Sequence, residues 1–101
     1  MSFNELINGE KPVLIDFYAD WCGPCKAMNP ILKEVAANIK GTARIVKINV
    51  DKNNAVASKL NVRSIPTLVL YQKGELKWRH TGMHSAEGLT QIIKQANEGL
   101  L

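Results

Sequence analysis

Apolar runs and alternating apolar and polar positions mark the strands of this chain. Residues 13–19 form a nearly continuous run of apolar and β-prone side chains, which is typical of a strand covered on both faces in a parallel sheet. Residues 43–50 alternate and predict a second strand. A third strand is predicted at 67–71, and the turn at 73–74 leads into a fourth at 75–80, so the last two strands form a hairpin.

Apolar side chains at intervals of three and four residues predict the helices. Ser2 and Glu5 have the spacing of a capping box, so a short helix begins at the N-terminus and ends at Gly9. An amphipathic helix is predicted from 24 to about 39, with a kink at Pro30, which lacks an amide hydrogen.

The second half of the chain holds two more helices. Asn53 or Asn54 caps a short helix that runs through Leu60, and Ser85 caps a C-terminal amphipathic helix. The resulting order α-β-α-β-α-β-β-α predicts one α/β domain over residues 1–101. Its mixed sheet carries helices on both faces, because parallel neighbours need right-handed helical crossovers.

Composition and charge narrow the function classes. The chain is 46% apolar and 22% charged, which is ordinary for a folded soluble protein and excludes a disordered one. It shows neither a secretory signal nor an apolar run of membrane-spanning length, so we expect a cytoplasmic protein with no membrane contact, and a processed export form is the alternative. The net charge of +4 comes from lysines spread evenly along the chain, and this argues against nucleic-acid binding.

The chemistry is expected at Cys22 and Cys25, where a buried strand ends and a helix begins. A cytoplasmic cysteine pair is more often catalytic or metal-binding than structural. The amide groups and dipole of the helix start favour a thiolate on Cys22, which is therefore the predicted nucleophile, and Cys25 lies one turn deeper. Pro24 suits the first helical turn, and Gly23 leaves room for a substrate.

The segment from Phe17 to Lys26 reads Phe-Tyr-Ala-Asp-Trp-Cys-Gly-Pro-Cys-Lys and closely resembles the thioredoxin family. The resemblance continues through residues 64–67 and 81–82 and covers nearly the whole chain. It implies a thioredoxin-like three-layer α/β/α sandwich. The family's usual first strand has no residues here to form it, so we expect a four-stranded sheet with one uncovered edge.

The resemblance also implies an activity. In this family the first thiolate attacks a protein disulfide, and the second thiol resolves the mixed disulfide, roles that match Cys22 and Cys25. The Gly23–Pro24 pair resembles that of the reducing members, which implies a general protein-disulfide reductase. No bound cofactor is expected. A flavin-dependent thioredoxin reductase, drawing on NADPH, would reduce the Cys22–Cys25 disulfide, oxidised proteins would be the substrates, and the chain would be a monomer.

Asp16 interrupts the first apolar strand, and burial of a carboxylate is costly unless it is paired or neutral. The matching family position carries a buried acid that exchanges protons with the second cysteine, so the resemblance makes Asp16 the general acid/base for Cys25. The alternative is a strand face open to water. Lys47 matches a family lysine beside that acid and is expected to modulate it, although a plain solvated lysine also fits the pattern.

Pro66 begins a strand, and sequence alone predicts a trans peptide there, because only about one X-Pro bond in twenty is cis. The resemblance of residues 65–67 to the family's loop implies the opposite, a cis peptide bond before Pro66, with the proline lying against the cysteine pair. The family resemblance also implies a shallow substrate groove, for which ordinary packing is the alternative. Its members here are Trp21, Ile65, Thr67, Gly82 and Met83, together with Gly23 and Pro24.

His80 and His84 raise the possibility of a zinc site with the two cysteines. The histidines lie far along the chain from Cys22 and Cys25, outside the usual zinc-finger interval, so we expect no metal. Two further functions remain open. The chain could be a thioredoxin-like binding module whose thiols matter little, or the dedicated reductant of one client enzyme.

Overall fold

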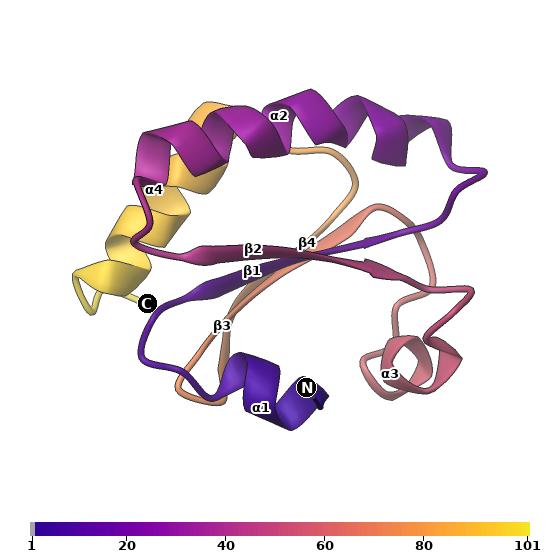
Figure 1. Cartoon of the computed structure of the whole chain (residues 1–101), viewed down its shortest axis with the longest axis horizontal. Coiled ribbons are helices and arrows are strands. Elements are labelled where there is room, and N and C mark those ends of the chain that lie inside the picture. Colours follow the sequence, from indigo (N-terminus) through magenta and orange to yellow (C-terminus); the bar gives the residue numbers. More distant parts are fainter. Residues whose placement is uncertain (1) are drawn as a thin grey trace.

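A four-stranded mixed sheet lies at the centre of the molecule (Figure 1). The computed structural model of the chain describes residues 2–101. The strands are β1 (Val13–Tyr18), β2 (Arg44–Asn49), β3 (Thr67–Gln72) and β4 (Glu75–Thr81). They lie in the order β2-β1-β3-β4, in which β1 is parallel to β2 and antiparallel to β3, and β4 is antiparallel to β3. The expected mixed, four-stranded sheet is confirmed.

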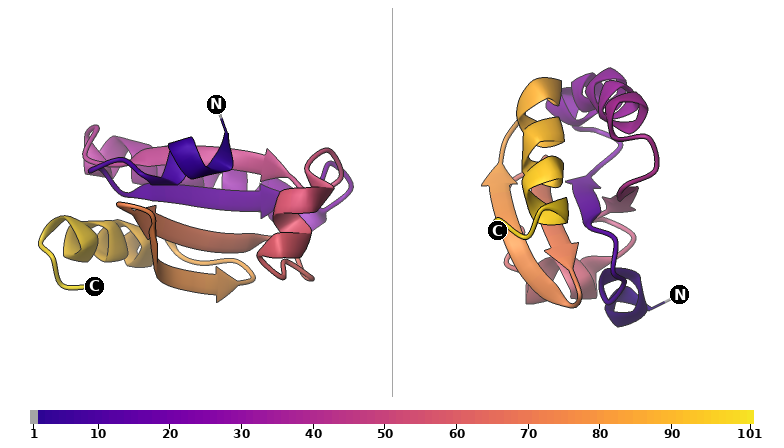
Figure 2. Two further views of the ribbon diagram at one scale, coloured as in Figure 1. Left: turned by 90° about the horizontal axis from the view of Figure 1, so that it is seen from below. Right: turned by 90° about the vertical axis from the view of Figure 1, so that its left-hand side faces the viewer.

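Helices cover both faces of this sheet, as the two views of Figure 2 show. They are α1 (Phe3–Ile7), α2 (Gly23–Ile39), α3 (Asn54–Lys59) and α4 (Ala86–Asn97). Leu14, Leu68 and Leu70 pack under α2 and α4 in one apolar cluster. Ile15, Phe17 and other side chains of the opposite sheet face pack against α1 and α3 in a second cluster. The expected α/β/α sandwich is therefore confirmed, because strand side chains alternate between two helix-covered faces.

The sequence predicts N-terminal caps for α1, α3 and α4, and two of these three caps form as expected. Ser2 and Glu5 form the expected capping box at α1. The Ser85 hydroxyl accepts a hydrogen bond from a backbone N–H in the first turn of α4. Asn53 precedes α3 as expected, but its side chain makes no capping bond and donates instead to the Asn49 carbonyl. That contact ties α3 back to the end of β2.

The connection from β1 to α2 positions the cysteines. β1 ends at Tyr18, one residue before the predicted boundary, and α2 begins at Gly23, one residue before Pro24. The helix continues through Pro30 to Ile39. Cys22 occupies the N-cap of α2, so the sulfur chemistry stands at the start of a long helix. Within residues 2–101, no helix is both long and apolar enough to cross a membrane.

Candidate active site

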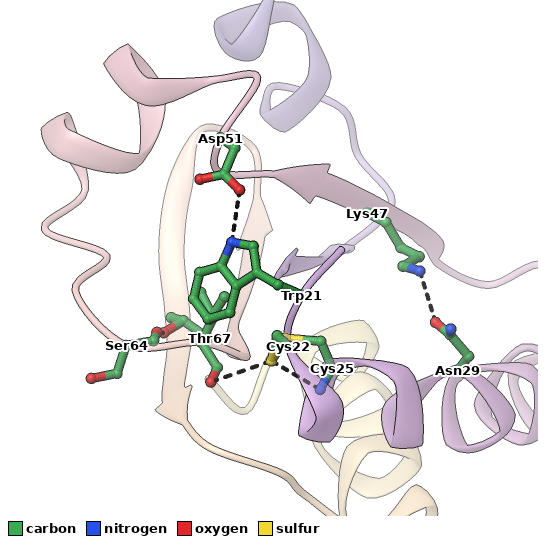
Figure 3. The surroundings of a disulfide bond; sticks show 9 residues. Trp21, Cys22, Cys25, Asn29, Lys47, Asp51, Ser64 and Thr67 are labelled. Atoms are coloured by element: carbon green, nitrogen blue, oxygen red, sulfur yellow. Dashed lines mark hydrogen bonds between the residues drawn. A yellow bond between two sulfur atoms is a disulfide. The ribbon is translucent and has the colours of Figure 1, made fainter. Parts of the chain in front are cut away.

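Cys22 and Cys25 are joined by a disulfide at the N-terminus of α2 (Figure 3). Their α-carbons are 5.3 Å apart, which is an ordinary separation for this bond. The Cys22 Sγ accepts a hydrogen bond from the Cys25 backbone N–H at 3.1 Å. Cys22 is 5% exposed and Cys25 only 2%. Both sulfurs are therefore well shielded, and Cys25 is the deeper of the two.

The two sulfurs have different surroundings. The Cys25 N–H of the first helical turn points at Cys22 Sγ, and the helix dipole favours negative charge at this position. Pro24 occupies the first turn, where it removes no helical hydrogen bond. The space that a side chain on Gly23 would occupy is open, so a substrate disulfide can approach from that side.

The loop before β3 lies against the cysteine pair. The Ile65–Pro66 peptide bond is cis, as the family resemblance implies. Cys22 Sγ lies 3.8 Å from the Ile65 carbonyl oxygen, and Ile65 packs on the cysteine cluster. The Pro66 carbonyl accepts a hydrogen bond from Gly82 N–H at 2.8 Å, which brings the loop after β4 to the same place. Segments far apart in the sequence thus meet around Cys22.

Thr67 differs from the rest of the expected groove. It is 1% exposed, and its hydroxyl donates a hydrogen bond to the Ser64 carbonyl. Thr67 is therefore closed to a substrate, because this exposure is that of the whole residue, and its strand is paired on both sides. Ile65 is half-buried and Gly82 is partly exposed, so both can contribute surface.

Trp21 and Met83 form the most exposed apolar surface of the site. Trp21 is 71% exposed and Met83 is 44% exposed. The indole Nε1 of Trp21 donates a hydrogen bond to Asp51 Oδ2 at 2.9 Å, visible in Figure 3. Asp51 was not predicted from the sequence. Its position directly after the second strand was the available signal, because the carboxyl ends of parallel neighbours meet at one edge of the sheet.

Asp16 is completely buried, which excludes the alternative of a strand face open to water. Neither of its carboxylate oxygens has a hydrogen-bond partner among residues 2–101. Burial raises the pKa of Asp16 to about 6, and the nearby charge of Lys47 opposes this rise. The carboxyl group can therefore gain and lose a proton close to neutral pH.

Lys47 lies on β2 directly beside Asp16 of β1 in the parallel register. Its ammonium donates a hydrogen bond to Asn29 Oδ1 at 2.7 Å and lies 4.3 Å from the centroid of the Tyr18 ring. Lys47 is exposed, yet its ammonium contacts both an amide oxygen and an aromatic ring. Asn29 was not predicted as a site residue, and its spacing of four residues from Cys25 on an amphipathic helix was the signal that could have found it.

His80 and His84 do come together, but not with the cysteines. Their ring centroids are 4.9 Å apart, and the His80 Nε2 is hydrogen-bonded to the Met83 carbonyl at 3.0 Å. Over residues 2–101, no group of three or more His, Cys, Asp or Glu side chains is placed to hold a metal ion. The four residues of the zinc alternative are therefore not assembled into one site.

Comparison with known proteins agrees with this geometry. The family model described as Thioredoxin matches residues 1–95. A thioredoxin of Rickettsia felis is 38% identical over 92 residues, which cover 91% of this chain and 88% of that protein. Thioredoxin 1 of Chlorobaculum tepidum is 44% identical over 87 residues, covering 86% of each chain.

Solved structures are similar over the same extent. Mitochondrial thioredoxin 3 of Saccharomyces cerevisiae in its oxidised form superposes with a TM-score of 0.82 at 36% identity, covering 92% of this chain and 86% of that one. A thioredoxin variant from Halobacterium salinarum also gives a TM-score of 0.82, at 38% identity and covering 91% and 80% of the two chains.

Proposed function

The chain belongs to the thioredoxin family and is a thiol–disulfide oxidoreductase, and we propose that it works as a general protein-disulfide reductase. The observation that carries this proposal is the Cys22–Cys25 disulfide at the start of α2, where the Cys22 sulfur accepts a backbone N–H. The exposed Trp21 ring beside it supports broad specificity, because an aromatic surface offers contact area without demanding one substrate sequence.

The reaction runs in two exchanges. The Cys22 thiolate attacks one sulfur of a substrate disulfide, forming a mixed disulfide and releasing one substrate thiolate. Cys25 then loses its proton and attacks Cys22 Sγ, which releases the second substrate thiolate and forms the Cys22–Cys25 disulfide. Two electrons pass to the substrate, whose two sulfurs take up protons. A flavin-dependent thioredoxin reductase using NADPH would return the pair to the dithiol state.

Asp16 is the proposed general acid/base for Cys25 in the second exchange. It lies on the sheet face under α2, two residues before Tyr18, whose side chain packs on the cysteine cluster. A buried carboxyl group with a pKa of about 6 can accept the Cys25 proton near neutral pH. Lys47, beside Asp16 in the sheet, modulates this transfer by favouring the charged form of the acid.

The substrate groove is proposed to consist of surface around the nucleophile. Trp21, Ile65 and Met83 offer apolar contact, and the half-buried backbone of Ile65, before cis-Pro66, offers polar groups. Such contacts favour extended protein segments that carry a disulfide. We further propose that the protein acts as a monomer in the cytoplasm, where reducing conditions keep the cysteine pair of such a reductase in the dithiol form.

Turnover of a protein disulfide tests the proposal. The purified chain is mixed with NADPH, thioredoxin reductase and insulin, and NADPH oxidation is followed by absorbance. We expect catalytic turnover by the wild type and none by Cys22→Ser. If the wild type is reduced by the reductase but does not reduce insulin, a dedicated reductant of one client replaces the general function. If the pair is not reduced at all, the binding-module function gains support.

A further inference from the structure

The ammonium group of Lys47 is held in one place although its residue is exposed. Three observations define that place: a 2.7 Å hydrogen bond to Asn29 Oδ1, a 4.3 Å approach to the Tyr18 ring centroid, and the register that sets Lys47 beside Asp16. Figure 3 shows the Lys47 and Asn29 side chains pointing toward each other from β2 and α2. The hydrogen bond links the edge strand to the helix that carries the cysteines.

A cavity of about 380 Å³ opens at this point. It is lined by residues of β1, of the β1–α2 connection, of α2 and of β2, namely Tyr18, Ala19, Asp20, Cys25, Lys26, Asn29 and Lys47. Asn29 follows Cys25 by four residues, so both face the cavity from one side of α2. The volume is ample for water, whose share of liquid volume is about 30 Å³.

We propose that Asn29 is a positioning residue that anchors the Lys47 ammonium at this cavity and thereby controls how readily Asp16 exchanges its proton. This proposal rests on the proposed function, in which Asp16 accepts the proton of Cys25. Asn29 itself touches neither the sulfurs nor a substrate in this scheme. It acts by fixing the position of the Lys47 ammonium.

The need for an anchor follows from the chemistry of lysine. An ammonium on a flexible four-carbon stem is strongly hydrated, and an exposed lysine gains both side-chain entropy and hydration by extending into water. The Asn29 amide oxygen and the Tyr18 ring face oppose this movement by binding the cation on the α2 side of β2. Loss of Asn29 would leave the weaker ring contact alone.

Among the charged groups around Asp16, Lys47 has the main effect on the pKa of this carboxyl group. On β3, the residue opposite Asp16 is the apolar Leu68. Lys26 of α2 and Asp20 of the β1–α2 connection line the cavity with opposite charges, and the cysteines are neutral in the disulfide. Lys47 is the charge that lowers the Asp16 pKa against the rise due to burial. If its ammonium moves into water, this opposition weakens and the pKa of Asp16 rises beyond about 6.

The test is the titration of the Asp16 side-chain carboxyl carbon by nuclear magnetic resonance in the oxidised protein. We expect Asn29→Ala to raise the Asp16 pKa by about half a unit, since part of one nearby charge is lost. Lys47→Met should raise it at least as much. The double variant should match Lys47→Met alone, because Asn29 acts only through Lys47.

Asn38→Ala is the matched control. Asn38 also lies on α2, and its amide donates a hydrogen bond to the Thr90 hydroxyl on α4, away from the cysteines. We expect it to leave the Asp16 titration unchanged. The proposal is overturned if Asn29→Ala leaves the Asp16 pKa unchanged or lowers it, or if its effect persists in the Lys47→Met background.

The titration needs no substrate and no reductase, so its outcome is separate from that of the proposed function. A pH profile of the second exchange adds the link between them. If the carboxyl titration shifts in Asn29→Ala but the pH profile of mixed-disulfide resolution does not, Asn29 positions Lys47 and the proposed catalytic use of Asp16 is wrong. If both shift upward together, positioning and use are supported.

Discussion

The indole Nε1 of Trp21 donates a hydrogen bond to Asp51 Oδ2 at 2.9 Å, so the most exposed aromatic ring of the site is tied to the end of β2. Trp21 comes from the connection after β1, and Asp51 follows the neighbouring parallel strand. The bond restrains a ring that is 71% exposed and has few packing contacts to hold it. We therefore expect the restrained ring to present a defined surface to a substrate beside Cys22.

Asp51→Ala is expected to weaken the use of protein substrates. Loss of a hydrogen bond of about 1 kcal/mol should raise KM for insulin about fivefold, with a smaller change in kcat. Asp51→Asn keeps an acceptor oxygen and should fall between the wild type and the alanine variant. Steady-state kinetics with the reductase measure both constants. An alanine variant with wild-type KM would show that this bond does not contribute to binding.

The two cysteines are expected to differ when each is replaced by serine. Cys25→Ser should trap a mixed disulfide with an oxidised protein, because Cys22 still attacks and nothing resolves the product. Cys22→Ser should lose turnover and form no such adduct, since Cys25 is less exposed than Cys22 and lies inside the first turn of α2, whereas Cys22 is its N-cap. Mass spectrometry after mixing with the substrate reads out both variants. An adduct on Cys22→Ser alone would reverse the two roles.

Asp16→Asn is expected to stabilise the protein in a pH-dependent way. Burial raises the Asp16 pKa from 3.8 to about 6, so between these values the folded protein holds a proton that the unfolded chain releases. The free energy of unfolding therefore falls as pH rises through this range, and the penalty is complete above about 6. At about 1.4 kcal/mol per unit, asparagine should gain about 3 kcal/mol more at pH 8 than at low pH.

Denaturant titrations of both proteins at pH 4 and pH 8 measure this difference. Any constant cost of the buried amide cancels in the comparison between the two pH values. Glu34→Gln, at an exposed acid of α2, is the control and should show no comparable dependence. A gain at pH 8 that does not exceed the gain at pH 4 would contradict a raised pKa for Asp16.

The same variant should resolve the mixed disulfide more slowly. Asparagine cannot accept the Cys25 proton, so the rate of the second exchange should fall roughly 10- to 100-fold near neutral pH. This loss lies at or below the lower end of the usual contribution of general-base catalysis. The first attack by Cys22 should change less. Single-turnover kinetics with a disulfide substrate separate the two steps. Equal slowing of both would point to a disturbed site instead of a lost base.

Ser85→Ala tests the N-cap of α4, which the sequence predicts. The Ser85 hydroxyl accepts the Gly88 N–H at 3.0 Å at the start of α4, which packs beside α2. Removal of such a cap should lower the free energy of unfolding by about 1 kcal/mol. Ser85→Asp should restore most of the loss, because its carboxylate also accepts this bond. Chemical denaturation gives the three values.

The sequence by itself determined the helices and strands and the place of the cysteine pair between β1 and α2. Hydrophobic periodicity and capping residues act within a few positions of the chain, so the sequence predicts each strand end, and the start of α2 beside Cys22, to within one residue. The predicted assignment of Cys22 as nucleophile is equally local, because it depends on which sulfur lies nearer the helix start.

Only the tertiary structure decided what surrounds those sulfurs. The bonds from Trp21 to Asp51 and from Lys47 to Asn29 join segments whose distance depends on strand register and on the packing of α2. The buried Asp16 carboxylate without a partner is likewise a property of the assembled sheet and helices. Sequence periodicity describes which face a side chain occupies, whereas its partners are chosen by contacts between distant elements, and these form only when the whole chain packs.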